Sequence, residues 1–168
     1  MNAAMKWGVI LAAIEFVINL VSMGAGLHTN QAAGMVTIVI YIGANVACVV
    51  MALKATAAVK GYGGQLGSGV LLGVVAAVLI VVLSYLLLTV VFPDATDEML
   101  AMQAAQVESS GAPQEQIDMQ LKVMETMSTP AIQAAMGGFF TVLTSVIASA
   151  IAAIWLRKKP TASPAPAV

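Results

Sequence analysis

The chain has 168 residues, of which 60% are apolar and only 9% are charged, whereas soluble domains carry roughly 25% charged residues. This composition excludes a disordered chain, and the single cysteine, Cys48, excludes a disulfide scaffold. A net charge of −1 offers no electrostatic basis for binding nucleic acid. The high apolar and low charged content instead predicts an integral membrane protein in contact with the lipid bilayer.

Four stretches reach the roughly 20 apolar residues that a helix needs to cross the hydrocarbon core. They cover about residues 7–27, 32–53, 66–92 and 131–156. Glu15 is their only formally charged residue, and none has the alternating pattern of a membrane β-barrel strand. We therefore expect an all-α integral membrane protein whose domain, residues 1–159, holds four transmembrane helices.

The connections between these spans differ in length and character. A short turn carries the only histidine, His28, and a glycine-rich link joins the second and third spans. Residues 94–129 form an amphipathic segment that predicts two short helices, the second beginning at Pro113. Residues 160–168, rich in proline and alanine, predict a flexible tail. No internal repeat supports a transporter built from inverted repeats.

The basic residues predict the orientation of the chain. Six of the seven cations lie at one membrane side, before the first span, between the second and third, and after the fourth: Lys6, Lys54, Lys60, Arg157, Lys158 and Lys159. Seven of the eight acids lie in residues 94–129. The positive-inside rule then makes both termini cytoplasmic and residues 94–129 periplasmic, in a multi-pass protein of the bacterial inner membrane.

Small residues recur on each span at three- or four-residue spacing, as in Gly69, Gly73 and Ala77. This pattern favours close helix packing in a membrane, and therefore a compact four-helix bundle. Counting along the spans at about 1.5 Å per residue brings Glu15, Asn45 and a serine of the fourth span to a similar depth. Glu15, Asn19, Asn45 and Ser145 are therefore a candidate intramembrane polar cluster.

Glu15 needs an explanation because ionisable groups within a span are costly and usually face a bundle interior or a cavity. One hypothesis is a neutral, structural carboxyl group, hydrogen-bonded to Asn45 or a serine. A second is a role toward a partner protein. A third is a proton or cation site with Asn19 and Asn45 as neighbours.

Other motifs offer little chemistry. With one histidine and one cysteine, no catalytic set or zinc cluster can be assembled, so we expect no enzyme activity, no metal site and no cofactor. His28 lies in a turn, where a hydrogen-bonding histidine is a simpler interpretation than a haem or pigment ligand. The pairs Met99/Met102 and Met124/Met127 have spacings that suit a Cu(I) site, but methionine is also an adaptable packing residue, which we favour.

The order of several short motifs resembles a bacterial family known as domain of unknown function 4199. These motifs are Trp7-Gly8, Lys60-Gly61-Tyr62 with Gly64 and Gly69, Pro93-Asp94, Met124 and Met127 before Pro130, Gly137-Gly138-Phe139-Phe140, and Lys158-Lys159. The resemblance covers nearly the whole chain apart from the tail. It implies four spans and no assigned activity, and it brings no catalytic residues.

Two functions are consistent with these features. The first is a non-catalytic accessory or scaffolding subunit of a larger inner-membrane complex, with photosynthetic and respiratory complexes as candidate hosts. Its partner protein would contact methionine-rich faces of the periplasmic segment, at Met99, Met102, Ile117, Leu121 and Met124. The alternative is a small ion, proton or solute transporter that uses Glu15. A water-filled space lined by Glu15, Asn19 and Tyr41 would favour the transporter, and a dry, close-packed interior would favour the subunit.

Overall fold

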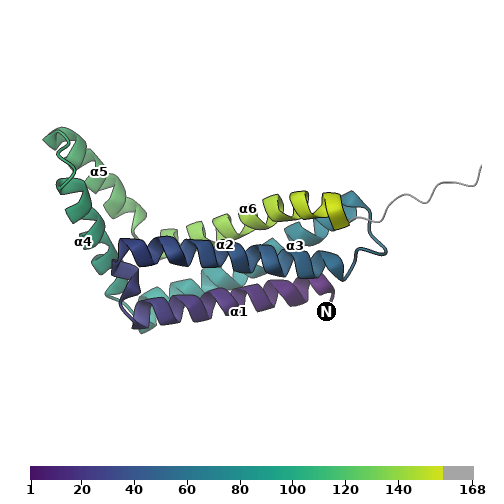
Figure 1. Ribbon diagram of the computed structural model, residues 1–168. Helices are drawn as coiled ribbons and strands as arrows, with labels where there is room; N and C mark the ends of the chain where they lie inside the picture. The colour runs from purple at the N-terminus through teal and green to yellow at the C-terminus, as the bar shows by residue number, and fades with distance from the viewer. Residues whose placement is uncertain (157–168) are drawn as a thin grey trace, which may run out of the picture.

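The computed structural model describes residues 1–156, and within that range every regular element is helical (Figure 1). Four of the helices are long and apolar enough to cross a membrane. They are α1 (Ala3–Gly24), α2 (Gln31–Lys54), α3 (Tyr62–Leu86) and α6 (Pro130–Leu156). The expected all-α membrane fold with four transmembrane helices is therefore confirmed. The tail at 160–168 and the cations at 157–159 lie outside the described residues.

The helix boundaries follow from local capping. Asn2 and Asn30 precede α1 and α2, and their side chains accept hydrogen bonds from the backbone N–H groups of Met5 (2.9 Å) and Ala33 (3.1 Å). Helix α6 begins at Pro130, where a missing N–H costs nothing. Compared with the predicted spans, α1 and α3 begin four residues earlier and α2 begins one residue earlier.

Helix α3 does not end as a regular α-helix. Its last turn, η2 (Leu87–Val91), is a π-helix, closed by a 2.8 Å hydrogen bond from the Phe92 N–H to the Leu87 carbonyl. Two helices follow, α4 (Ala95–Glu108) and the amphipathic α5 (Gln114–Met127), separated by a turn in which Gly111 has a φ of 71°. They form a hairpin that projects from one end of the bundle (Figure 1).

The four long helices form a ring in the order α1–α3–α6–α2, with the most extensive contact between α3 and α6. Glycines permit the closest approaches. A Cβ atom at Gly73 would lie 2.8 Å from the Cβ of Ser145, and one at Gly8 would lie 2.8 Å from the Leu72 carbonyl oxygen. The predicted small-residue packing is thus present at both the α3–α6 and the α1–α3 contacts.

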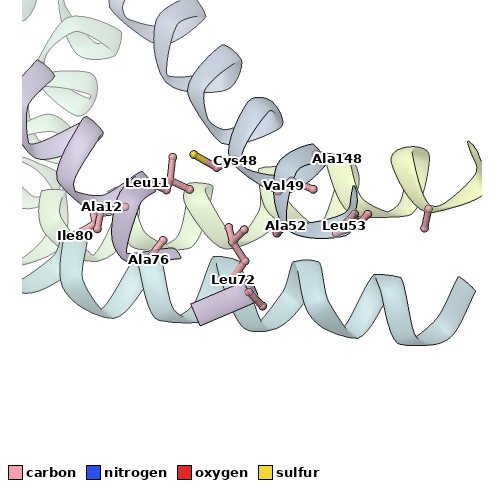
Figure 2. Close-up of a cluster of buried hydrophobic side chains, with 12 residues drawn as sticks. Leu11, Ala12, Cys48, Val49, Ala52, Leu53, Leu72, Ala76, Ile80 and Ala148 are labelled. Carbon is pink, nitrogen blue, oxygen red and sulfur yellow. The ribbon is translucent and has the colours of Figure 1, made fainter. Parts of the chain in front are cut away.

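The bundle has a tightly packed and a loosely packed half. We call the end with residues 1–6 and the α2–α3 link the link end, and the end with α4 and α5 the hairpin end. Apolar side chains such as Leu11, Val49, Leu53 and Leu72 are fully buried and pack together toward the link end (Figure 2). In α2 every buried residue lies between Asn45 and Leu53, so the half of α2 nearer the hairpin end has none.

Candidate functional site: a cavity above Glu15

The loosely packed half of the bundle encloses a partly open cavity of about 470 Å³. Its walls come from all four long helices, from the π-helical turn and from α4, which contributes Met99. Most of the lining is apolar, and the polar side chains include Glu15, Asn19, Tyr41, Asn45 and Thr141. Apolar walls with a few polar groups are typical of small-molecule binding sites.

Glu15 lies where the cavity meets the packed half. Its side chain is buried, with only 7% of the residue exposed. Its hydrogen bond is with Thr141, whose Oγ1 is 3.4 Å from Glu15 Oε2. The same hydroxyl lies closer to the Gly137 carbonyl oxygen, at 3.0 Å, and a hydroxyl has a single proton to donate. The carboxyl group therefore keeps most of its hydrogen-bonding capacity free.

Asn45 makes different contacts from those that the sequence suggested. Its Nδ2 donates to Ser145 Oγ at 3.0 Å and to the Thr141 carbonyl oxygen at 3.3 Å, and so joins α2 to α6. The hypothesis of a structural Glu15 expected a hydrogen bond to Asn45 or a serine, whereas the structure gives Glu15 the threonine Thr141 instead. Asn45 and Ser145 act as the interhelical pair, and Glu15 faces the cavity.

Tyr41 adds a second polar group with free capacity. Among the described residues, its buried hydroxyl has no hydrogen-bond partner. A buried polar group without a partner costs on the order of 1–3 kcal/mol. Tyr41 and Glu15 both line the cavity, so a ligand with a polar group could satisfy both at once.

The structure brings together three of the four residues of the predicted polar cluster at this cavity, namely Glu15, Asn19 and Asn45. Ser145 is fully buried and supports Asn45 through their mutual hydrogen bonds. The predicted cluster left out Thr141 and Gln133. The four-residue spacing of Gly137 and Thr141 placed both on the interior face of α6, and Gln133 continues that row by one more turn.

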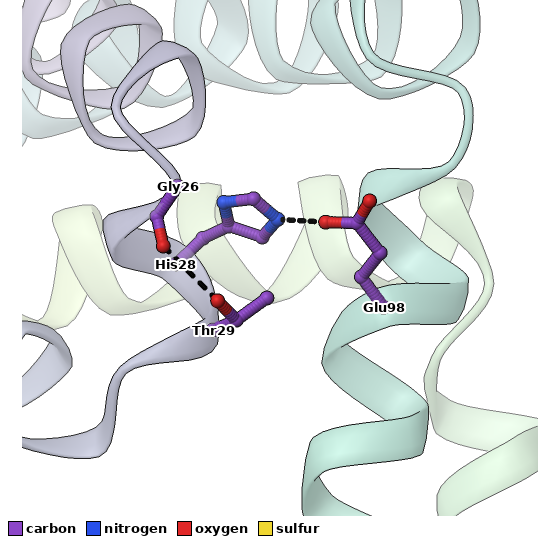
Figure 3. A network of polar contacts seen from close by, with 4 residues as sticks. All are labelled: Gly26, His28, Thr29 and Glu98. Atoms are coloured by element: carbon purple, nitrogen blue, oxygen red, sulfur yellow. Dashed lines mark hydrogen bonds and ion pairs between the residues drawn. The ribbon is translucent and has the colours of Figure 1, made fainter.

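His28 contacts a carboxylate in the hairpin. Its Nε2 lies 2.8 Å from Glu98 Oε2, so the turn between α1 and α2 is joined to α4 (Figure 3). Glu98 directly precedes Met99, which lines the cavity. The sequence favoured a hydrogen-bonding histidine in this turn without indicating its partner, which lies 70 positions away.

The residues expected to contact a partner protein have varied environments. Ile117 is buried, Met99 lines the cavity, and Met102, Leu121 and Met124 are half-buried. The exposed apolar side chains of α5 are instead Met119, Val123 and Met127, which recur every four residues along the helix. This second row, which we call the α5 stripe, is the accessible apolar face of the hairpin.

These features define a class: a helical membrane protein with four transmembrane helices and, inside the bundle, a mostly apolar cavity with a few polar side chains. Comparison with known families goes one step further. The model of the family described as "Protein of unknown function (DUF4199)" matches residues 6–158. The chain belongs to this family. No curated protein and no solved structure matches the chain.

Proposed function

We propose that this protein is a transporter that binds a solute inside the membrane, in the cavity lined by Glu15, and does not change it covalently. One observation carries the proposal, which is the space lined by Glu15, Asn19 and Tyr41. A close-packed interior would have supported a purely structural role. The packed core at the link end separates the cavity from that end, so access is from the hairpin end and its surroundings.

Accessibility of the cavity to water-borne reagents tests this proposal. Thr144 lines the cavity, and the nearby Ile147 of α6 is exposed on the outer surface of the helices, where lipid would surround it. In a Cys48→Ala background, a charged maleimide should label Thr144→Cys and leave Ile147→Cys unlabelled in membranes. Equal, negligible labelling of both cysteines would contradict the proposal.

A cavity-filling variant sharpens the same experiment. A Cβ atom at Gly137 meets only Ile80, at 3.9 Å, so Gly137→Leu places its side chain in the cavity without a backbone clash. Gly43→Leu is the matched control, because nothing lies within 4 Å of a Cβ atom there and Gly43 is exposed. Labelling of Thr144→Cys should fall with Gly137→Leu and stay unchanged with Gly43→Leu.

We also propose that the protein lies in the bacterial inner membrane with its termini cytoplasmic and residues 94–129 periplasmic. The support is the positive-inside rule, together with the position of Lys6, Lys54 and Lys60 near the link end. The test uses cysteines placed at Ser110 and at Gly63 in the Cys48→Ala background. An impermeant reagent added to intact cells should label the first and not the second, and the reverse pattern would overturn the orientation.

A second candidate function, that of an accessory subunit of a larger membrane complex, is favoured by the exposed α5 stripe of Met119, Val123 and Met127. Flexible methionine side chains suit contact surfaces, and the hairpin projects beyond the bundle. Pull-down from native membranes in mild detergent should recover one large complex, and changing the α5 stripe to serine should weaken the recovery. A homo-oligomer recovered alone, with the stripe intact, would contradict this role.

A further inference from the structure

The charge of the cavity lining is one-sided. Glu15 is the only acidic residue among the side chains that line it, and no lysine, arginine or histidine accompanies it. None of the charged groups of the hairpin end lines the cavity, and two of them, His28 and Glu98, contact each other. Any formal charge that the cavity carries is therefore negative.

We propose that the ligand of this cavity is an organic cation with an apolar body, bound with its cationic group against Glu15. This inference rests on the proposed function and names the class of solute. It follows from three properties of the cavity: a carboxyl group with free hydrogen-bonding capacity, an unpartnered Tyr41 hydroxyl, and walls of aliphatic side chains such as Ile38, Ile42 and Leu88.

The alternatives by charge fit less well. An anion would face the Glu15 carboxylate with no basic group to offset the repulsion. A neutral apolar molecule would contact the aliphatic walls but leave the Tyr41 hydroxyl without a partner and Glu15 with only its long hydrogen bond to Thr141, at a cost for these buried groups. A cation satisfies the carboxylate directly, and in apolar surroundings that attraction is stronger than in water. The aliphatic walls then bind the rest of the molecule.

Cation binding is coupled to a proton. When Glu15 is neutral, the carboxyl group releases its proton to water as the cation binds, giving a carboxylate–cation pair, and the charges balance. Other titratable groups near Glu15 are Tyr41 and Cys48, both on α2. The facing positions of α3 and α6 are Ser84, Thr141 and Thr144, which do not titrate, and α4 contributes Met99. Proton and cation thus compete for one group, and binding tightens as the pH rises until Glu15 is fully ionised.

The matched probes are tetraphenylphosphonium and tetraphenylborate, which have the same shape and opposite charge. We expect the purified, full-length protein in nanodiscs to bind the cation saturably and at least tenfold more tightly than the anion. Glu15→Gln should lose at least tenfold in affinity for the cation and lose its pH dependence, while Glu15→Asp should retain both. Glu115→Gln, the same chemical change on the exposed face of α5, is the control and should bind as the wild type does.

The outcomes separate this inference from the function on which it rests. Equal affinity for the two probes, or binding that is insensitive to Glu15→Gln in a protein that still elutes as a folded species, would overturn the cation assignment. Loss of binding with Gly137→Leu but not with Gly43→Leu would then still locate the ligand in the cavity. If Thr144→Cys is also inaccessible to the charged maleimide, the proposed function fails together with the inference.

Discussion

Substituting Gly69 by alanine tests the packing of α3 against α6 most directly. A Cβ atom at Gly69 would overlap the side chain of Ser149 and lie 3.5 Å from the Ser145 carbonyl oxygen. Ser149 is fully buried and has no space to yield. Overpacking of this kind typically costs about 1–3 kcal/mol, so we expect the free energy of unfolding to fall by that amount.

Gly67→Ala is the control because it lies two residues away in the same helix, with nothing within 4 Å of its Cβ position. Transmembrane helices stay helical when a bundle comes apart, so the higher helix propensity of alanine stabilises the folded and the dissociated state about equally. Gly67→Ala should therefore change the free energy of unfolding by less than about 0.5 kcal/mol. Unfolding in mixed micelles, followed by tryptophan fluorescence, measures both variants. The double variant Gly69→Ala/Ser149→Gly should recover much of the loss, since it removes the overlapping side chain. Equal stability of Gly69→Ala and Gly67→Ala would refute the packing described for α3 and α6.

Two further predictions concern polar contacts. Asn45→Ala should lower the free energy of unfolding because it removes the hydrogen bonds to Ser145 and Thr141. The expected loss is about 0.5–2 kcal/mol, the range of interhelical hydrogen bonds in membranes. Val46→Ala, on the exposed face of the same helix, should cost much less. No difference between the two would contradict the interhelical role of Asn45. Glu98→Ala should speed backbone hydrogen exchange in α4, with less than about 1 kcal/mol of global destabilisation because Glu98 is 54% exposed. Unchanged hydrogen exchange in α4 would contradict the pairing of His28 with Glu98.

The four spans were predictable because length and apolar composition alone decide whether a helix can cross the hydrocarbon core. Small residues such as Gly69 and Gly73 likewise carry their packing role in their spacing. Depth counting also brought Glu15, Asn45 and a serine of α6 to one level, since the rise of an α-helix is constant. It could not give the rotation of each helix about its own axis. Because rotation decides which side chain faces which, Thr141 rather than Asn45 became the partner of Glu15.

The cavity was not predictable for a related reason. Its volume is the difference between what the helices enclose and what their side chains fill, and this depends on helix tilt and separation rather than on periodicity. The pairing of His28 with Glu98 depends in turn on where the hairpin leaves the bundle. In the amphipathic α5, the pattern indicated an apolar face through Ile117, which is buried, and did not separate it from the exposed α5 stripe.

Because of the π-helical turn at Leu87–Val91, the direction in which the hairpin leaves the bundle depends on the number of residues in that turn. A π turn takes in one more residue than an α turn, so the chain that follows it is rotated by roughly 100° relative to an uninterrupted α-helix. Pro93 and α4 leave the bundle in the direction set by this extra residue, and Glu98 meets His28 as a result. Deleting a single residue from this turn would restore regular α geometry without changing any residue of the hairpin itself, and would swing α4, with Glu98 and Met99, away from His28 and the cavity. The loss of one residue from this turn would thereby remove from the cavity lining the one residue that α4 contributes, Met99.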